Sequence, residues 1–156
     1  MNYKKIFIIF FLILLPSLEA HNRSESYSKF QFLNVEDGVE IKVTGTIKQG
    51  IFRLLRPETK YRSYPDFLTY LQNSINLGDQ CQIQESVTFN ENNAAGVLKF
   101  FWDFKCVEMP SQVSISLFQD LGPTHTHIAR GSIDDETIPE FMFANSSDVW
   151  LIGSLS

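Results

Sequence analysis

Apolar and polar residues alternate along most of the chain after residue 20. Because successive side chains of a β-strand point to opposite faces, this pattern places every second residue on one buried face. Phe30 and Phe32 belong to one such run, and residues 39–43 form a second run directly after the turn-forming pair Asp37-Gly38. The pattern predicts a hairpin of two antiparallel strands.

The same alternation predicts the remaining strands. One strand is expected over residues 81–89 and a returning strand over 98–106, with a polar turn at 90–93 between them. Two more are expected at 113–118 and at about 124–133, and a last one at either 140–144 or 149–152.

One segment has helical rather than strand spacing. It begins near Pro65 and Asp66 and is expected to end at Gly78, and its apolar residues are Phe67, Tyr70, Leu71 and Ile75. The fold class predicted from all these elements is all-β with one short helix, a β-sandwich of immunoglobulin-like or cupredoxin-like type.

The first 20 residues have the plan of a cleavable signal peptide. Lys4 and Lys5 precede the apolar run Ile6–Leu15, and a small residue, Ala20, stands at the expected cleavage point. The apolar run is too short to cross a bilayer. We therefore expect export to the periplasm or the extracellular space. The rest of the 156-residue chain, 21–156, is expected to form a single domain that begins with His21.

Charge narrows the range of partners. Without the signal peptide, which contains Lys4, Lys5 and Glu19, the chain has 11 basic and 17 acidic residues, a net charge of -6. An acidic balance with no basic cluster argues against nucleic acid as a partner.

The only two cysteines, Cys81 and Cys106, are expected to form a disulfide, because the pair lies in an exported chain. A metal-thiolate pair is less favoured, since no CxxC spacing occurs. Both cysteines fall on the apolar side of their expected strands, so the bridge should join neighbouring strands or the two sheets.

The three histidines of the chain are the candidate chemistry. His125 and His127 are two residues apart, so on a strand their imidazoles point to the same face. His21 would add its imidazole and the α-amine released by cleavage. Four nitrogens of this kind suit Cu(II), the divalent first-row ion that binds most tightly, and the predicted metal ligands are therefore His21, His125 and His127.

Other interpretations compete with this one. An HxH pair is often just two exposed histidines, and the metal site requires the N-terminal strand to lie beside the strand over 124–133. No Gly-x-Ser-x-Gly motif occurs and both cysteines are expected to be oxidised, so a hydrolase is disfavoured. A copper oxidoreductase of the histidine-brace kind is a weaker alternative, and otherwise we expect no enzyme.

Three segments together resemble a known family. They are His21-x-x-Ser24-x-Ser26-Tyr27, the run Gly122-Pro123-Thr124-His125-Thr126-His127-Ile128-Ala129-Arg130, and Glu140-Phe141-Met142-Phe143. The chain resembles the periplasmic N-terminal domain of HupE/UreJ-type membrane proteins, which are linked with hydrogenase and urease accessory functions. The resemblance implies metal handling, nickel included. Such proteins continue into several transmembrane helices where this sequence stops, so permease activity is not carried over, and whether the chain is a truncated form stays open.

A more distant similarity is to the copper-binding, cupredoxin-like domain in the B subunit of particulate methane monooxygenase, which also pairs a mature N-terminal histidine with an HxH motif. The leading hypothesis is an exported domain that binds copper, or else nickel or zinc, for sequestration or for delivery to a membrane transporter or accessory protein. The alternative is a metal-free β-sandwich interaction module of a membrane accessory system.

Overall fold

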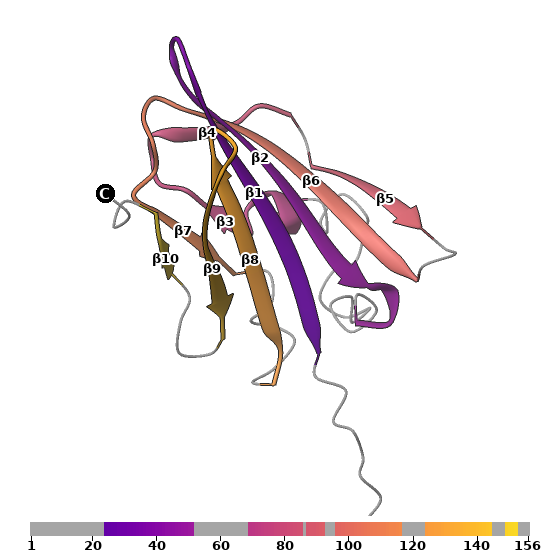
Figure 1. The fold of residues 1–156 in the computed structure, drawn as a ribbon. Helices are drawn as coiled ribbons and strands as arrows, with labels where there is room; N and C mark the ends of the chain where they lie inside the picture. Colours follow the sequence, from indigo (N-terminus) through magenta and orange to yellow (C-terminus); the bar gives the residue numbers. More distant parts are fainter. Residues whose placement is uncertain are drawn as a thin grey trace, which may run out of the picture.

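The computed structural model describes residues 24–51, 69–85, 87–92, 96–116, 124–144 and 149–152. Figure 1 shows their strands in two sheets. The strands are β1 (Glu25–Val35), β2 (Gly38–Lys48), β3 (Ile75–Asn76), β4 (Cys81–Ile83), β5 (Thr88–Asn92), β6 (Val97–Cys106), β7 (Gln112–Ile115), β8 (Thr126–Ile133), β9 (Glu136–Phe143) and β10 (Val149–Leu151).

The larger sheet contains seven of these strands, in the order β4-β6-β2-β1-β8-β9 with β5 also paired to β6. The smaller sheet has the order β10-β7-β3. The inward residues of the two sheets meet in one core, where the rings of Phe30 on β1 and Trp150 on β10 lie edge to face at 5.7 Å. The predicted all-β sandwich is confirmed, while its assignment to the immunoglobulin-like or cupredoxin-like type stays a prediction.

The predicted hairpin joins β1 and β2 through Glu36 and Asp37. Gly38 follows the turn with a φ of 138°, a backbone conformation that residues other than glycine rarely adopt. The backbone carbonyl of Cys106 also occupies the space that a Cβ at Gly38 would need. Glycine is therefore required here both by its conformation and by the close approach of β6.

The predicted disulfide is confirmed, and it joins two neighbouring strands. Cys81 of β4 and Cys106 of β6 are directly opposite in the register of the larger sheet. The single strand predicted over residues 81–89 is wrong, because the chain leaves the sheet after Ile83 and returns as β5 at Thr88. The exposed Glu85 falls in this break. The turn predicted at 90–93 is also placed too early, since β5 continues to Asn92.

The helix prediction is wrong at its C-terminal end. Within the predicted segment the described helical residues are 69–72, and a further short helical stretch at 49–51 follows β2. The Ser74 hydroxyl donates to the carbonyl of Leu71 just after the helical residues. Ile75, expected on the helix, instead begins β3 and pairs with Ile115 of β7, where its side chain is buried between the sheets. Pairing with a neighbouring strand overrides the helical spacing. Pro65, Asp66 and Phe67 lie outside the described residues.

Two strands, not one, end the described part of the chain: β9 and β10. A bulge in β9 sets Pro139 and Glu140 against the single residue Arg130 of β8. The extra residue reverses the alternation, so that Phe141 and Phe143 both pack toward the core. Strand β7 ends at Ile115, before the end predicted for it at 118, and residues 117–120 are not among those described.

Candidate functional site

The N-terminal strand lies directly beside the histidine strand, as the predicted metal site requires. β1 and β8 are parallel neighbours, with Ser26 opposite His127. At the start of the pair, the amide of Thr126 donates to the carbonyl of Ser24 over 2.9 Å. Figure 1 shows the two strands side by side over the length of β8. His21 lies outside the described residues, so its part in the site stays a prediction.

The inward side chains of β1 and β8 interdigitate as a ladder of hydrogen bonds. Ser24 Oγ lies 2.7 Å from Nδ1 of His125, and Ser26 Oγ lies 2.8 Å from Nε2 of the same ring. Ser26 Oγ also lies 2.7 Å from Nδ1 of His127, whose Nε2 lies 2.8 Å from Ser28 Oγ. Every ring nitrogen of the two histidines is therefore hydrogen-bonded to a serine hydroxyl. We call this set the His–Ser ladder.

Strand geometry explains the ladder. Ser26 and Ser28 share one face of β1, and the parallel register sets His127 of β8 opposite Ser26. Ser24 and His125 directly precede the two strands and continue the same alternation. A serine side chain is too short to fill the space between the sheets, which leaves room for the larger imidazoles from the neighbouring strand. The serine and histidine side chains together therefore fill a volume that apolar residues would otherwise fill.

Burial keeps both imidazoles neutral. His125 is 5% exposed and His127 is 2% exposed. Removal from water lowers the pKa of His125 to about 4, partly opposed by the nearby Glu25 carboxylate. It lowers the pKa of His127 to about 3, and the neighbouring His125 contributes in the same direction. Near neutral pH each ring therefore carries one N–H and one lone pair.

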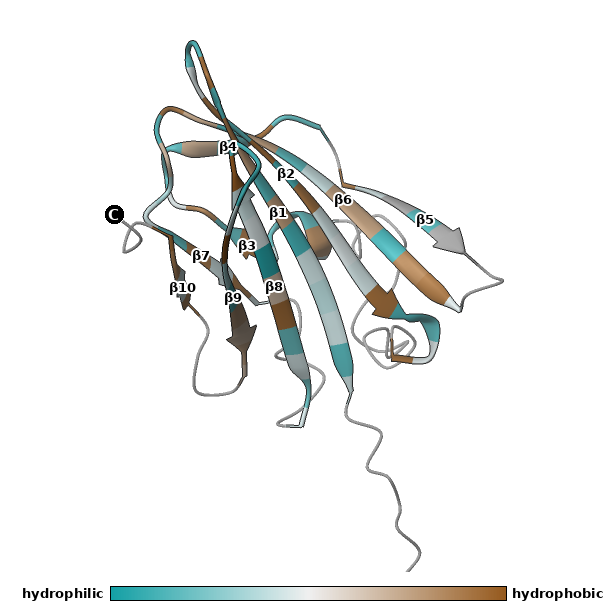
Figure 2. Cartoon of the chain, in the orientation of Figure 1, coloured by the Kyte–Doolittle hydropathy of each residue, from teal (hydrophilic) through white to brown (hydrophobic). Residues whose placement is uncertain are grey.

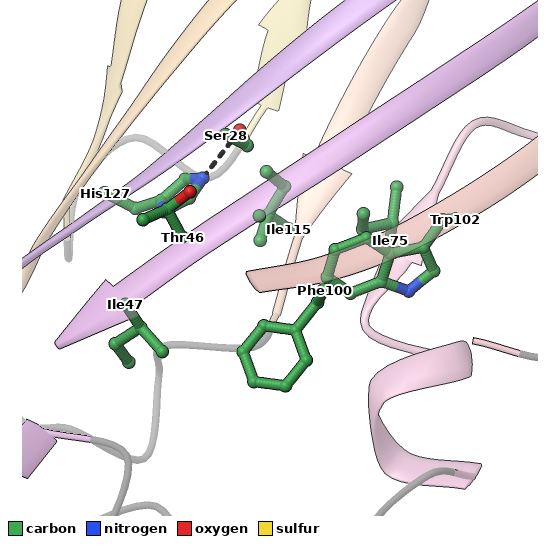
Figure 3. Close-up of a pocket in the computed structure, with 9 residues that line it drawn as sticks. Ser28, Thr46, Ile47, Ile75, Phe100, Trp102, Ile115 and His127 are labelled. Atoms are coloured by element: carbon green, nitrogen blue, oxygen red, sulfur yellow. Dashed lines mark hydrogen bonds between the residues drawn. The ribbon is translucent and has the colours of Figure 1, made fainter. Parts of the chain in front are cut away.

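The inner end of the ladder borders a cavity of about 10 Å³ in the core. Figure 3 shows the hydrogen bond between His127 and Ser28 at one side of this space, with Phe100 and Trp102 at the other. Its lining is mostly apolar, and its volume is at the lower limit for a single water molecule. The ladder is therefore enclosed by the core at this end, and only the Ser24 end, which is half-buried, lies near solvent.

The donor types of the ladder fit a soft or borderline metal ion, but the geometry does not present them openly. Neutral imidazole is a preferred ligand of copper, nickel and zinc. Each ring nitrogen, however, already has a serine partner, so an ion has to displace a hydroxyl. Among the described residues, no group of three or more histidine, cysteine, aspartate or glutamate side chains is arranged to hold a metal ion. A complete site needs a ligand from outside these residues.

The serines are the members of the site that sequence analysis missed. Ser24 and Ser26 entered only as parts of a family motif, and Ser28 did not enter at all. The available signal was the alternation Ser24-x-Ser26-x-Ser28 directly before Phe30, with the period of a strand but without apolar residues. Asp134 and Asp135 form the turn between β8 and β9, where the Asp134 carboxylate accepts two hydrogen bonds from Asn34.

Comparison with known proteins adds no family: no family model matches the chain, and no match to a curated protein is significant. Within the described residues, no helix combines the length and the apolar character that crossing a lipid bilayer requires.

Proposed function

We propose that this chain is an exported metal-binding domain that holds copper, or else nickel or zinc, through His21 and the histidine pair 125 and 127. The observation that carries the proposal is the parallel pairing of β1 with β8. It sets Ser24, the fourth residue after the proposed cleavage point, in contact with His125.

Chain length is compatible with this site. Cleavage after Ala20 would leave three residues ahead of Ser24, a length that extends about 10 Å at most. Ser24 is itself in hydrogen-bond contact with His125. A short turn back toward β8 would therefore suffice for the α-amine and imidazole of His21 to reach the half-buried end of the ladder.

The electrostatics of the ladder are compatible with the proposal. Metal ions bind the neutral form of imidazole, and the lowered pKa values of His125 and His127 keep both rings in that form at neutral pH. The α-amine of His21, with an ordinary pKa near 8, holds its proton weakly. An ion would displace about one proton on binding at neutral pH.

The biological role that we propose is sequestration of the ion or its delivery to a membrane transporter or accessory protein. The resemblance to the periplasmic domain of HupE/UreJ-type proteins supports this role, and the disulfide between Cys81 and Cys106 is consistent with an oxidising compartment. The proposed location is periplasmic or extracellular.

A Cu(II) titration tests the proposal, with three proteins compared at pH 7. The first begins at His21, the second carries one extra N-terminal residue, and the third begins at His21 and carries His125→Gln. We expect tight one-to-one binding by the first protein and a loss of at least tenfold in affinity in each of the others. Equal binding by all three would reject the proposed site.

One observation favours a second function. Within the described residues, no buried side-chain nitrogen or oxygen lacks a hydrogen-bond partner, so the ladder is satisfied without an ion. A metal-free β-sandwich that contacts a membrane partner would have this property. The metal-free alternative predicts the same melting temperature with and without copper. The proposed metal site instead predicts that copper at a free concentration a hundred times Kd stabilises the fold by about 2.7 kcal/mol.

A further inference from the structure

The central hydroxyl of the His–Ser ladder, that of Ser26, is shared between two imidazoles. It lies 2.8 Å from Nε2 of His125 and 2.7 Å from Nδ1 of His127, and its residue is fully buried. Among the described residues, these two nitrogens are the hydrogen-bond partners of the Ser26 hydroxyl. Since a hydroxyl carries one hydrogen, Ser26 can donate to one ring and must accept from the other.

We propose that Ser26 couples the tautomers of the two histidines, so that they switch together and offer a metal ion one nitrogen, Nδ1 of His125, with His127 as a positioning residue. The coupling concerns the protein without an ion. The choice of ligand atom rests on the proposed function, and it specifies how the histidine pair takes part in that site.

The coupling follows from counting hydrogens along the ladder. Each neutral imidazole has one N–H, and each of the four contacts needs one hydrogen. If Ser26 donates to Nδ1 of His127, that ring carries its hydrogen on Nε2 and donates to Ser28. Ser26 must then accept from Nε2 of His125. Both rings are therefore in the Nε2–H form.

The opposite arrangement is equally consistent. If Ser26 donates to Nε2 of His125, that ring carries its hydrogen on Nδ1 and donates to Ser24. Ser26 then accepts from Nδ1 of His127, and the Ser28 hydroxyl donates to Nε2. Both rings are in the Nδ1–H form. Of the two mixed pairs, one places lone pairs on both nitrogens and leaves a Ser26 contact without a hydrogen. The other places an N–H on both nitrogens, so the Ser26 O–H can donate to neither ring. Both are unfavourable in a fully buried place.

This coupling decides which nitrogen an ion can use. An ion that took the place of the Ser26 hydroxyl and bound both imidazoles would need lone pairs on Nε2 of His125 and Nδ1 of His127. The two rings would then be in different tautomers, which the coupling disfavours. Nδ1 of His125 has a lone pair in the shared Nε2–H form, and its partner Ser24 is the half-buried serine of the ladder. An ion there replaces one hydroxyl and leaves the other three contacts intact.

The role of His127 is then to fix the tautomer and orientation of His125 through Ser26. Histidine ligands generally have such a partner on the ring nitrogen that does not bind the metal. Here that partner is Ser26. The chain of hydrogen bonds continues from Ser26 into the core through the imidazole of His127 and the Ser28 hydroxyl.

Long-range 1H–15N correlation spectra of 15N-labelled protein beginning at His21 test the proposal at pH 7. The spectra distinguish the two tautomers of each ring. Without metal we expect the same tautomer, or the same ratio of tautomers, in His125 and His127. Opposite tautomers would overturn the coupling whether or not the protein binds metal.

The diamagnetic ion Zn²⁺ tests the ligand atom in the same sample. We expect a large shift of Nδ1 of His125 and the Nε2–H form in both rings. A metal shift on Nδ1 of His127 would overturn the ligand assignment while supporting the proposed function. Matched tautomers without any zinc shift would leave the coupling in place and count against the proposed function and the ligand assignment together.

Two variants test whether the Ser26 hydroxyl itself, and not the ladder as a whole, couples the two tautomers. Ser28→Ala removes a terminal hydroxyl, so the two rings should keep matching tautomer ratios. Ser26→Ala removes the shared hydroxyl, so the ratios should differ. Matching ratios in Ser26→Ala would show that another feature sets them and would overturn the role of Ser26. If Ser26→Ala does not fold, the spectra of the wild type and Ser28→Ala still decide the coupling.

Discussion

The paired strands β1 and β8 have two halves that fill the same core in different ways. In the first half, the inward residues of β1 are serines, and they interdigitate with His125 and His127. In the second half they are Phe30 and Phe32, which lie opposite Gly131 and Ile133 of β8 in the parallel register. Figure 2 shows the contrast, because brown bands appear on β1 only in its second half.

Both halves are buried, but different interactions stabilise them. The aromatic half needs volume: a Cβ at Gly131 would meet the side chains of Ile138 and Trp150 at 2.7 to 2.8 Å, so glycine leaves space for the ring that packs on Phe30. The polar half needs partners, because every buried donor and acceptor must be paired. The aromatic half should therefore contribute more to stability, and the ladder should be sensitive to pH and to the loss of a single hydroxyl.

The largest effect is expected in the aromatic half. Phe30→Ala would leave a cavity between the two sheets and should lower the free energy of unfolding by about 3–5 kcal/mol, measured by urea denaturation. Tyr27→Ala, on the outer face of the same strand and 40% exposed, is the matched control and should lower it by less than about 1 kcal/mol. A loss below about 1 kcal/mol for Phe30→Ala would contradict the packing of the two sheets.

The ladder should make stability depend on pH. The folded pKa values of about 4 and 3 for His125 and His127 lie below the unfolded value of about 6.5, so the unfolded chain binds more protons between these limits. Stability should be constant above about pH 6.5 and should fall as the pH falls toward 4. The expected loss between pH 7 and pH 5 is about 2–4 kcal/mol.

Urea denaturation at a series of pH values measures this loss. The interval from pH 7 to pH 5 lies above the range in which Asp37 and Asp134 titrate, since hydrogen bonds lower the pKa of both carboxyls. His127→Gln should reduce the slope by about half, because one of two buried imidazoles is removed. A constant free energy of unfolding from pH 7 to pH 5 would mean that the imidazoles are not buried as neutral groups.

A smaller effect is expected from the shared hydroxyl. Ser26→Ala would leave Nε2 of His125 and Nδ1 of His127 without their common partner, at a cost of about 1–3 kcal/mol in the free energy of unfolding. Chemical denaturation at pH 7 measures it, with Ser132→Ala on the outer side of β8 as a control of the same chemistry. A neutral result for Ser26→Ala would show that the two rings find other partners.

The contrast between the halves also explains what the sequence could predict. Phe30 and Phe32 identify the second half of β1, because apolar alternation is the signal of a half-buried strand. The first half lacks that signal, since its inward residues are serines. The disulfide was predictable because the chain has two cysteines only.

The pairing of β1 with β8 was not predictable in this way. Its hydrogen bonds join residues about a hundred positions apart, and periodicity within one segment carries no information about its neighbour in a sheet. The HxH spacing correctly placed both imidazoles on one face, but it could not show that this face is buried against serines. The same limit explains Ile75, whose strand partner on β7 is also distant in sequence.

The smallest effect on stability is expected at the half-buried end of the ladder, and there it should be joined by an effect on binding. Ser24→Ala should lower the free energy of unfolding by only about 0.5–1 kcal/mol, because water can replace its hydroxyl at Nδ1 of His125. The same change removes the group that an ion must displace, so Cu(II) affinity of protein beginning at His21 should rise severalfold in a titration. Ser28→Ala, at the enclosed end, should leave that affinity unchanged. Weaker binding by Ser24→Ala would mean that the Ser24 hydroxyl assists the ion instead of competing with it.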